Sequence, residues 1–197
     1  MLLQNKSIKK FVCGIDEAGR GPLAGPVYAA AVILNEDFPC NMLNDSKKLS
    51  ALKREELRLK VCSSALAWGV GWATHEEIDK INILQASLLA MKRAFQEMMS
   101  KNTSLSDENI SVIADGNFAP DIPVSCRAMI KADAEIHEVM AASIIAKQER
   151  DDHMDKMALL YPQYCYEKHK GYPTKLHRDL IKKYGPSPIQ RLSFSVR

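Results

Sequence analysis

Two adjacent carboxylates, Asp16 and Glu17, follow a short apolar run at residues 11–15 and precede a loop rich in glycine and proline. Carboxylate oxygens are the ligands that hard divalent cations prefer. The loop contains Gly19 and Gly21, and glycine lets backbone N–H groups approach a phosphate or a sugar closely. Acids, glycines and accessible backbone in one short segment indicate phosphodiester chemistry.

Two further acids occupy similar places in the chain. Asp115 follows the apolar run 110–114, and Asp133 lies between an alternating run and a long helical pattern. Loop residues at strand ends can converge on one edge of a sheet. Carboxylates gathered without a cation repel each other, whereas two ions about 4 Å apart can stabilise both the attacking and the leaving oxygen of phosphoryl transfer. For any single Asp a turn or cap role is the alternative, and the four act together only if the fold aligns them.

The elements that must position these acids alternate between strands and helices. Apolar or alternating runs predict strands at residues 11–15, 27–34, 66–74, 110–114 and 124–130. Helices are predicted from Ser50 to about residue 64, after the Thr74–Glu77 capping box, at about 134–160, and from the Thr174 cap to Gly185. We therefore predict an α/β fold, a mixed β-sheet flanked by helices with a helical C-terminal part.

Length and composition fit one domain. The 197 residues are predicted to form a single unit, 1–197, of which about 135–197 is the mostly helical, basic part. The five cysteines include no Cys-x-x-Cys pair, so neither a zinc site nor a redox dithiol is indicated. The N-terminus lacks a signal-peptide core, and the longest apolar run, 27–34, is too short to span a bilayer. A cytoplasmic protein is predicted.

The charge distribution is uneven along the chain. The net charge is +3, but residues 168–197 carry eight Lys or Arg and one acid, so this segment is +7 and the remainder −4. An acidic body with a basic C-terminal part is typical of a protein that binds a polyanion. A solvated helix face is the alternative interpretation.

Several longer motifs carry a resemblance. The chain contains Gly14-Ile-Asp-Glu-Ala-Gly-Arg-Gly-Pro-Leu-Ala-Gly-Pro-Val, then Leu43-Asn-Asp-Ser-Lys-Lys-Leu-Ser, Glu77-Ile-Asp-Lys-Ile-Asn-Ile-Leu, Ala114-Asp-Gly-Asn, Lys131-Ala-Asp, Ala141-Ala-Ser-Ile-Ile-Ala-Lys, His169-Lys-Gly-Tyr-Pro-Thr-Lys-Leu-His and Arg191-Leu-Ser-Phe. These blocks lie in order across nearly the whole chain, and together they resemble the ribonuclease HII family, the bacterial type 2 ribonucleases H.

The resemblance implies an RNase H-like fold and a metal-dependent endoribonuclease. Its substrates would be the RNA strand of RNA–DNA hybrids and duplex DNA with embedded ribonucleotides, cut on the 5′ side to leave 3′-hydroxyl and 5′-phosphate ends. Such an enzyme removes misincorporated ribonucleotides and RNA primers. The resemblance further implies one or two Mg²⁺ or Mn²⁺ ions, and we expect a monomer that does not bind membranes.

The family's residue roles carry over by position. Its four catalytic, metal-binding acids fall on Asp16, Glu17, Asp115 and Asp133. Its 2′-hydroxyl-sensing motif falls on Gly19, Arg20 and Gly21, and its sugar-packing tyrosine on Tyr172. Ser46 and Lys47 are expected to contact backbone phosphates. From the residues alone, a tight turn at the glycines and a packing role for the tyrosine remain alternatives.

This chain departs from the family pattern at two positions. Ala132 stands where a glycine is usual before the fourth acid, which would alter the backbone beside Asp133. Leu192 stands where a second arginine is usual, so a C-terminal phosphate contact would fall to Arg191 and Arg197. Two other functions stay open: a non-catalytic hybrid-binding protein that uses the basic segment, and a nuclease that acts on DNA alone.

Overall fold

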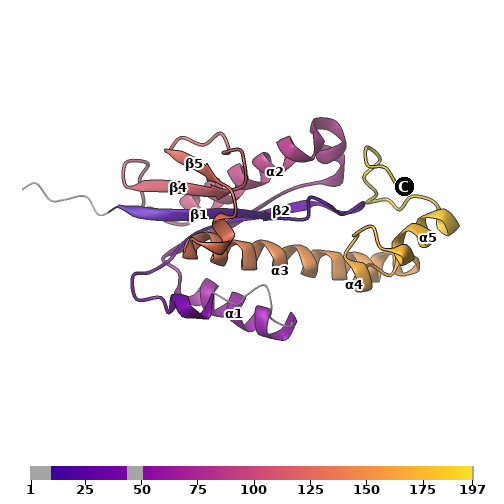
Figure 1. The fold of residues 1–197 in the computed structure, drawn as a ribbon, viewed down its shortest axis with the longest axis horizontal. Helices are drawn as coiled ribbons and strands as arrows, with labels where there is room; N and C mark the ends of the chain where they lie inside the picture. Colours follow the sequence, from indigo (N-terminus) through magenta and orange to yellow (C-terminus); the bar gives the residue numbers. More distant parts are fainter. Residues whose placement is uncertain (1–9, 44–50, 197) are drawn as a thin grey trace, which may run out of the picture.

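The structure is a computed structural model that describes residues 10–43 and 51–196. A five-stranded sheet lies between two layers of helices (Figure 1). Its strands, in spatial order, are β3 (Ala67–Ala73), β2 (Val27–Ile33), β1 (Phe11–Ala18), β4 (Ile110–Asp115) and β5 (Cys126–Met129). β2 and β3 run antiparallel to their neighbours, whereas β4 and β5 run parallel to β1. The predicted mixed sheet with flanking helices is therefore confirmed.

Helix α2 (His75–Ser100) covers one face of the sheet, and α3 (His137–Leu160) and α1 (Ala51–Ser64) cover the other (Figure 1). The Thr74–Glu77 capping box predicted from the sequence begins α2. The helix approaches β3 closely because Gly69 and Gly71 have no side chain. A Cβ atom on either glycine would lie within 2.4 Å of the α2 backbone.

Apolar residues fill both interfaces. Under α2 the core includes Cys13, Ile15 and Phe95, and on the opposite face Val32, Leu57 and Ile145 pack together; the six are at most 5% exposed. Residues 13 and 15 of β1 therefore face α2. Because side chains alternate along a strand, residues 14 and 16 face α3.

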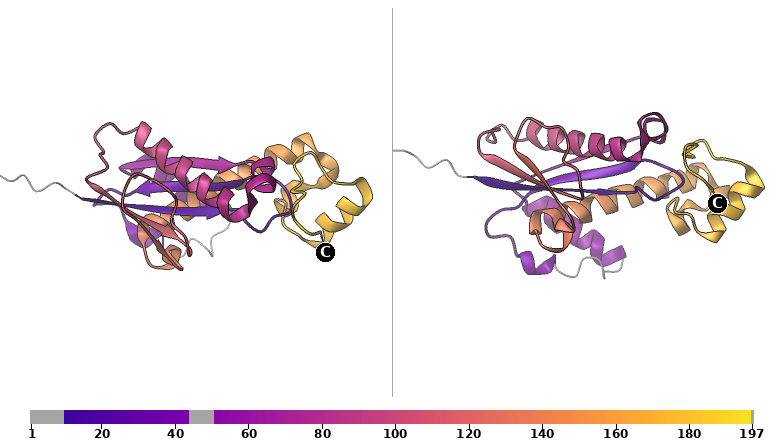
Figure 2. Two further views of the ribbon diagram at one scale, coloured as in Figure 1. Left: turned by 90° about the horizontal axis from the view of Figure 1, so that it is seen from above. Right: turned by 45° about the horizontal axis from the view of Figure 1, so that its top comes forward.

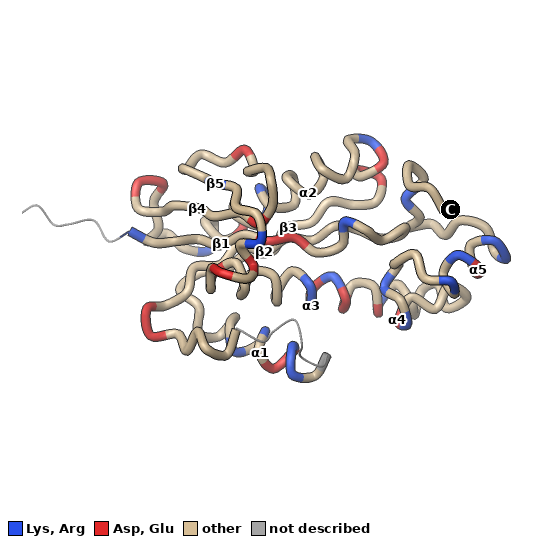
Figure 3. Tube along the Cα trace, viewed as in Figure 1, with Lys and Arg blue, Asp and Glu red and all other residues tan. Residues whose placement is uncertain are grey.

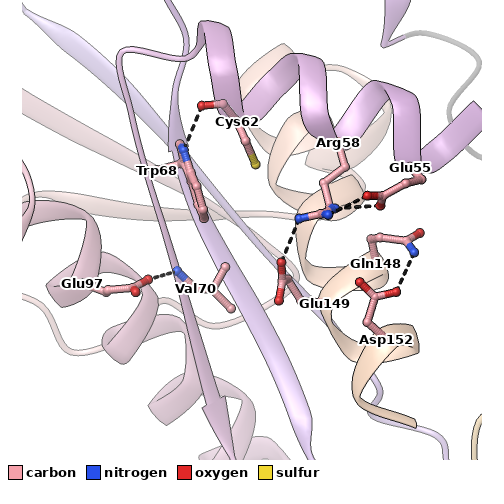
Figure 4. Close-up of polar contacts among 9 residues, drawn as sticks. All are labelled: Glu55, Arg58, Cys62, Trp68, Val70, Glu97, Gln148, Glu149 and Asp152. Carbon is pink, nitrogen blue, oxygen red and sulfur yellow. Dashed lines mark hydrogen bonds and ion pairs between the residues drawn. The ribbon is translucent and has the colours of Figure 1, made fainter. Parts of the chain in front are cut away.

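Polar contacts fix the outer elements, as Figure 4 shows. Arg58 of α1 donates to Glu55 on its own helix and to Glu149 on α3, with Nη1 3.1 Å from Glu149 Oε1. At the edge strand β3, the carboxylate of Glu97 accepts from the N–H of Val70. A side chain of α2 thus occupies an edge donor that would otherwise be free to pair with another strand.

The C-terminal part packs against the far end of α3 (Figure 2). It contains α4 (Tyr166–His169), α5 (Lys175–Tyr184) and the closing segment 185–196. Met154 and Ala158 of α3 meet Tyr164, Tyr166 and Ile189 in a third apolar cluster. The Thr174 cap and the end at Gly185 agree with prediction.

Three elements have a boundary that differs by more than one residue from the prediction. β1 continues to Ala18, so Asp16 and Glu17 lie inside the strand rather than after it. The strand predicted at 124–130 covers only Cys126–Met129. The helix predicted from about 134 begins at His137, after a separate 3₁₀ turn at Ala132–Ala134. Among the described residues, no helix is both long and apolar enough to cross a membrane.

Candidate active site

Three parallel strands bring the predicted acids to one edge of the sheet. Asp16 and Glu17 lie near the end of β1, Asp115 is the last residue of β4, and Asp133 lies in the 3₁₀ turn that follows β5. Ile15 pairs with Ala114, and Asp115 pairs with Met129, so Asp16 follows in β1 at the level where β4 and β5 end. We call these four residues the acidic edge.

The acids are close enough to repel one another. Burial raises the pKa of Asp16 well above its usual range, and the charges of Glu17 and Asp115 raise it further, although a hydrogen bond from Ser143 opposes them. Burial also raises the pKa of Glu17, against the nearby Arg20, and Asp115 adds to the rise. The backbone N–H of Asp133 lies 3.4 Å from Asp115 Oδ1, so the fourth acid borders the third.

The acidic edge fits a hard cation. Glu17 Oε2 is buried and accepts no hydrogen bond from the described residues, while Arg20 Nη1 lies 3.2 Å from Oε1. In residues 10–43 and 51–196, no three His, Cys, Asp or Glu side chains are placed so that they could together hold a metal ion. Repelling carboxylates with an unused buried oxygen are a donor set that an Mg²⁺ or Mn²⁺ ion would complete.

Two pockets meet at Glu17. The larger, of 330 Å³, is lined by Glu17, Ala18, Gly19, Arg54, Ser143, Ile144, Lys147 and Tyr172. The smaller, of 80 Å³, lies toward α2 and is lined by Glu17, Arg20, Leu84, Ser87, Leu88, Met91, Asp115, Gly116, Asn117 and Phe118. The acidic edge is therefore reached from both faces of the sheet.

The loop 19–26 borders both pockets, with Gly19 lining the larger one and Arg20 the smaller. Gly19 has a φ of +101°, a conformation that favours glycine, and Arg20 and Gly21 are exposed. A Cβ atom on Gly21 would meet only the ring of Tyr172, at 3.9 Å. The structure therefore places Tyr172 beside the predicted 2′-hydroxyl-sensing motif, although the two are about 150 residues apart in the sequence.

Tyr172 is held from both sides. Its N–H donates to the carbonyl of His169, at 2.8 Å, and its carbonyl accepts from Nδ1 of His177, at 3.0 Å. The side chains of Lys147 and Arg150 lie over its ring, at 5.8 and 5.5 Å from the centroid. His169 and His177 stack with a centroid separation of 4.4 Å and have structural roles.

Several residues lie where the sequence did not predict them. Arg191 is fully buried and donates to backbone carbonyls, so the prediction that it contacts phosphate is wrong. Ala132 has no positive φ; the left-handed residue is Lys131, which explains why alanine is accommodated. Ser46, Lys47 and Arg197 lie outside the described residues.

Sequence reasoning also missed residues of the larger pocket. Ser143 and Lys147 are four residues apart on α3, which places them on one helix face. That spacing was visible in the sequence, but nothing local indicated that this face borders Asp16. Arg54 of α1 lines the same pocket.

Comparisons with known proteins agree with this geometry. The family model for ribonuclease HII matches residues 13–197. The ribonuclease HII of Treponema denticola is 52% identical over 196 residues, which cover 95% of this chain and 99% of that protein. The ribonuclease HII of Idiomarina loihiensis is 48% identical over 185 residues, covering 94% and 95%.

Solved structures show the same architecture. The ribonuclease H2 of Pyrococcus horikoshii OT3 superposes with a TM-score of 0.71 at 27% identity, covering 94% of both chains. The ribonuclease HII of Archaeoglobus fulgidus, solved as a complex with PCNA, has a TM-score of 0.74 at 25% identity and covers 95% of this chain and 96% of that one. A Bst-RNase HIII in complex with Mn²⁺ shares the fold, with a TM-score of 0.78 at 16% identity over 96% of this chain and 69% of that one.

The fold and its acidic edge define an RNase H-type nuclease. The chain belongs to the ribonuclease HII family. Its activity is that of an endoribonuclease H, and its family acts on RNA–DNA hybrids.

Proposed function

We propose that this endonuclease is metal-dependent and cuts 5′ of ribonucleotides, both in RNA–DNA hybrids and at single ribonucleotides embedded in duplex DNA. The products would carry 3′-hydroxyl and 5′-phosphate ends, and the enzyme would remove misincorporated ribonucleotides and RNA primers. One observation carries the proposal. The ends of β1, β4 and β5 bring four acids to the edge where Gly19 and Tyr172 line a pocket.

Asp16, Glu17, Asp115 and Asp133 would hold one or two Mg²⁺ or Mn²⁺ ions. Such ions supply an activated nucleophile and stabilise charge on the attacking and leaving oxygens. Glu17 offers its unpartnered Oε2, and Arg20 would release Oε1. The Mn²⁺ complex of the RNase HIII with the same fold supports the choice of ion.

The ribose would be read by the loop at Gly19, Arg20 and Gly21. The 2′-hydroxyl is the group that marks a single ribonucleotide within DNA. Backbone N–H groups beside glycine can reach it because no side chain intervenes. Tyr172 also lines the pocket, and because the residue is 37% exposed its ring would be able to pack on the neighbouring sugar.

Phosphate contacts would come from several basic groups. Lys147 and Arg54 line the pocket that contains Gly19 and Tyr172. Lys and Arg residues of α4 and α5 extend this charge toward the C-terminal end (Figure 3). Ser46 and Lys47 remain proposed contacts. We further propose that the chain acts as a single-domain monomer in the cytoplasm.

The test is cleavage of three labelled substrates, in Mg²⁺, in Mn²⁺ and in EDTA. The substrates are a duplex with one embedded ribonucleotide, an RNA–DNA hybrid and an all-DNA duplex. We expect cleavage of the first two only, and none in EDTA. Asp16→Asn should abolish cleavage while largely sparing hybrid binding, whereas Asp37→Asn, at an exposed position, should cut normally.

Each alternative has its own signature in this experiment. Binding without cleavage in either metal would identify a hybrid-binding protein. A cut in the all-DNA duplex would refute the reading of the 2′-hydroxyl. Full turnover by Asp16→Asn in Mg²⁺ would refute the role of that carboxylate.

A further inference from the structure

Two arginines, Arg150 and Arg191, are completely buried beneath the loop 19–26. Neither forms an ion pair with an acidic side chain of the described residues. All donors of Arg191 reach backbone carbonyls instead, as do Nε and Nη2 of Arg150, while Arg150 Nη1 has no partner among those residues. Burying a cation without a carboxylate is costly unless hydrogen bonds replace its hydration. Such an arrangement needs an explanation beyond packing.

Arg191 uses its full set of donors on the loop. A guanidinium has five N–H groups in a planar fork. The five carbonyl oxygens that accept from it belong to Gly19 at 2.7 Å, Arg20 at 3.0 Å, Pro22 at 2.8 Å, Gly25 at 2.8 Å and Pro26 at 3.1 Å. One side chain therefore sets the direction of most peptide groups in the loop.

Arg150 completes the support from α3. It donates to the carbonyls of Pro26, at 3.1 Å, and Ala24, at 3.3 Å. A Cβ atom on Gly19 would lie only 2.0 Å from Arg150 Nε, so the loop backbone rests directly on this guanidinium. The same side chain lies over the ring of Tyr172.

The inward carbonyls determine where the N–H groups point. In a planar trans peptide the N–H of the next residue is directed opposite to the C=O. Because the carbonyls of Gly19 and Arg20 point at Arg191, the N–H groups of Arg20 and Gly21 point away from it. Both residues are exposed, and neither N–H bonds to another residue within 10–43 or 51–196. Two donors without partners among the described residues are thus presented to solvent beside Gly19, which lines the larger pocket.

The segment that carries Arg191 is itself fastened at both ends. Gly25 N–H donates to the carbonyl of Ile189, at 2.9 Å, and Arg191 N–H donates to that of Leu23, at 2.8 Å. Beyond Arg191, Asp79 of α2 accepts from the N–H of Leu192 and from Ser193. The loop and the segment around Arg191 are therefore held together, although they lie more than 160 residues apart in the sequence.

We propose that Arg191 is a positioning residue for ribose recognition: it holds the loop carbonyls inward so that the Arg20 and Gly21 N–H groups face the 2′-hydroxyl. The inference rests on the proposed role of this loop. Arg191 does not itself touch the substrate. Its effect passes through the peptide groups that it orients.

The test combines a change in the Arg191 side chain with a change at the 2′ position of the substrate, as in a double-mutant cycle. Cleavage is measured on duplexes whose single ribonucleotide carries a 2′-hydroxyl or a 2′-fluorine, with wild-type protein and with Arg191→Lys. Lysine keeps the charge but has three donors and no planar fork. We expect the wild-type preference for the hydroxyl to shrink about fivefold to tenfold in the variant. Arg58→Lys, which alters an arginine paired with carboxylates on α1 and α3, should leave the preference unchanged.

A spectrum separates loop displacement from general unfolding. The protein has nine glycines, so a ¹⁵N-glycine spectrum is simple. Arg191→Lys should shift the resonances of Gly19, Gly21 and Gly25 and leave those of Gly69 and Gly71 in β3 in place. If Arg191→Lys does not fold, Asp79→Ala loosens the same segment from its far end, and a smaller loss of preference is expected.

The outcomes distinguish this inference from the function beneath it. A wild-type enzyme with no preference for the hydroxyl would refute both the role of the loop and the inference. If the wild-type enzyme shows the preference and Arg191→Lys, or Asp79→Ala in its place, leaves it unchanged, the inference alone is refuted. An arginine with a purely structural role would lower cleavage of both substrates by the same factor.

Discussion

The acidic edge and the loop 19–26 lie side by side, but they differ in how their buried charged groups are satisfied by neighbouring groups. At the acidic edge, Asp115 raises the pKa of both Asp16 and Glu17, and a buried oxygen of Glu17 has no partner among the described residues. Under the loop, Arg191 is equally buried, but each of its donors meets a carbonyl. Within the described residues, the first region leaves a buried oxygen without a hydrogen bond, whereas Arg191 in the second leaves no donor without one.

This difference matches the two proposed roles: the acidic edge for the reaction, and Arg191 for the positioning of the loop. Burial and the charge of Arg150 lower the pKa of Arg191 to about 9, so the guanidinium remains charged at neutral pH while its contacts hold the loop. Burial also disfavours the charged form of Asp16, and there the neighbouring carboxylates of Glu17 and Asp115 add to the cost. Substitutions in the two regions should therefore change stability in opposite directions.

The largest expected effect is that of Asp115→Asn at the acidic edge. Loss of one carboxylate should lower cleavage of the single-ribonucleotide duplex by at least about a thousandfold. The same change removes a like charge beside Asp16 and Glu17, so the melting temperature in EDTA should rise by about 2 to 4 °C, which is about 1 kcal/mol for a chain of this size. Calorimetry and the cleavage assay measure the two effects.

Asp107→Asn, in the exposed loop before β4, is the matched control and should change neither quantity. A destabilised Asp115→Asn protein would contradict the view that the acids repel one another in the folded state. Retained activity would remove Asp115 from the proposed site.

The next effect compares two glycines of the loop. Gly19→Ala places a Cβ atom 2.0 Å from Arg150 Nε at a positive φ, and should cost about 2 to 4 kcal/mol in the free energy of unfolding. Gly21→Ala meets only the Tyr172 ring at ordinary contact distance, and should change stability by less than about 0.5 kcal/mol. Both should lose at least about tenfold in cleavage of the single-ribonucleotide duplex.

Urea unfolding and the cleavage assay together decide this comparison. A Gly21→Ala protein that is both stable and fully active would mean that the exposed N–H groups do not face the substrate. Equal destabilisation by the two substitutions would contradict the close contact between Gly19 and Arg150.

The acids of the acidic edge could be predicted from sequence because each one is recognisable within its own short segment. Each acid follows or ends an apolar run, and parallel strands end at a common edge, so the topology alone collects them. The support under the loop was not predictable in this way. Arg191 bonds to main-chain oxygens that any residue carries, and these lie more than 160 positions away. A basic residue near the end of the chain was therefore read as a phosphate contact.

For the fold, too, the features set by local sequence patterns were predicted, and a feature set by strand pairing was missed. Strands and capped helices were predicted from periodicity and from residues such as Thr74 and Thr174. The extension of β1 through Asp16 and Glu17 was missed because two acids look like a strand end. Their pairing with Ala30 and Ala29 of β2 keeps them in the sheet.

The last expected effect is on stability alone and concerns His177, which supports Tyr172 beside the loop. Burial and the neighbouring His169 lower the pKa of His177 to about 4, from an ordinary value of 6.5. Its Nδ1 contacts the Tyr172 carbonyl, and its buried Nε2 has no hydrogen-bond partner among the described residues. Between pH 4 and 6.5 the unfolded chain therefore binds more protons than the folded one.

The free energy of unfolding should consequently rise with pH across this window and level off above it. His177 should contribute at most about 3 kcal/mol to this rise. His169, stacked on the same ring with its pKa also lowered, contributes with the same sign. His177→Gln removes the titration and can keep a donor for the Tyr172 carbonyl, so urea unfolding in EDTA should show a flatter rise than in wild-type protein. His137→Gln, at an exposed position on α3, should keep the wild-type slope. An unchanged slope in His177→Gln would mean that this imidazole ionises as freely in the folded chain as in the unfolded one, and that the loop side does not depend on its remaining neutral.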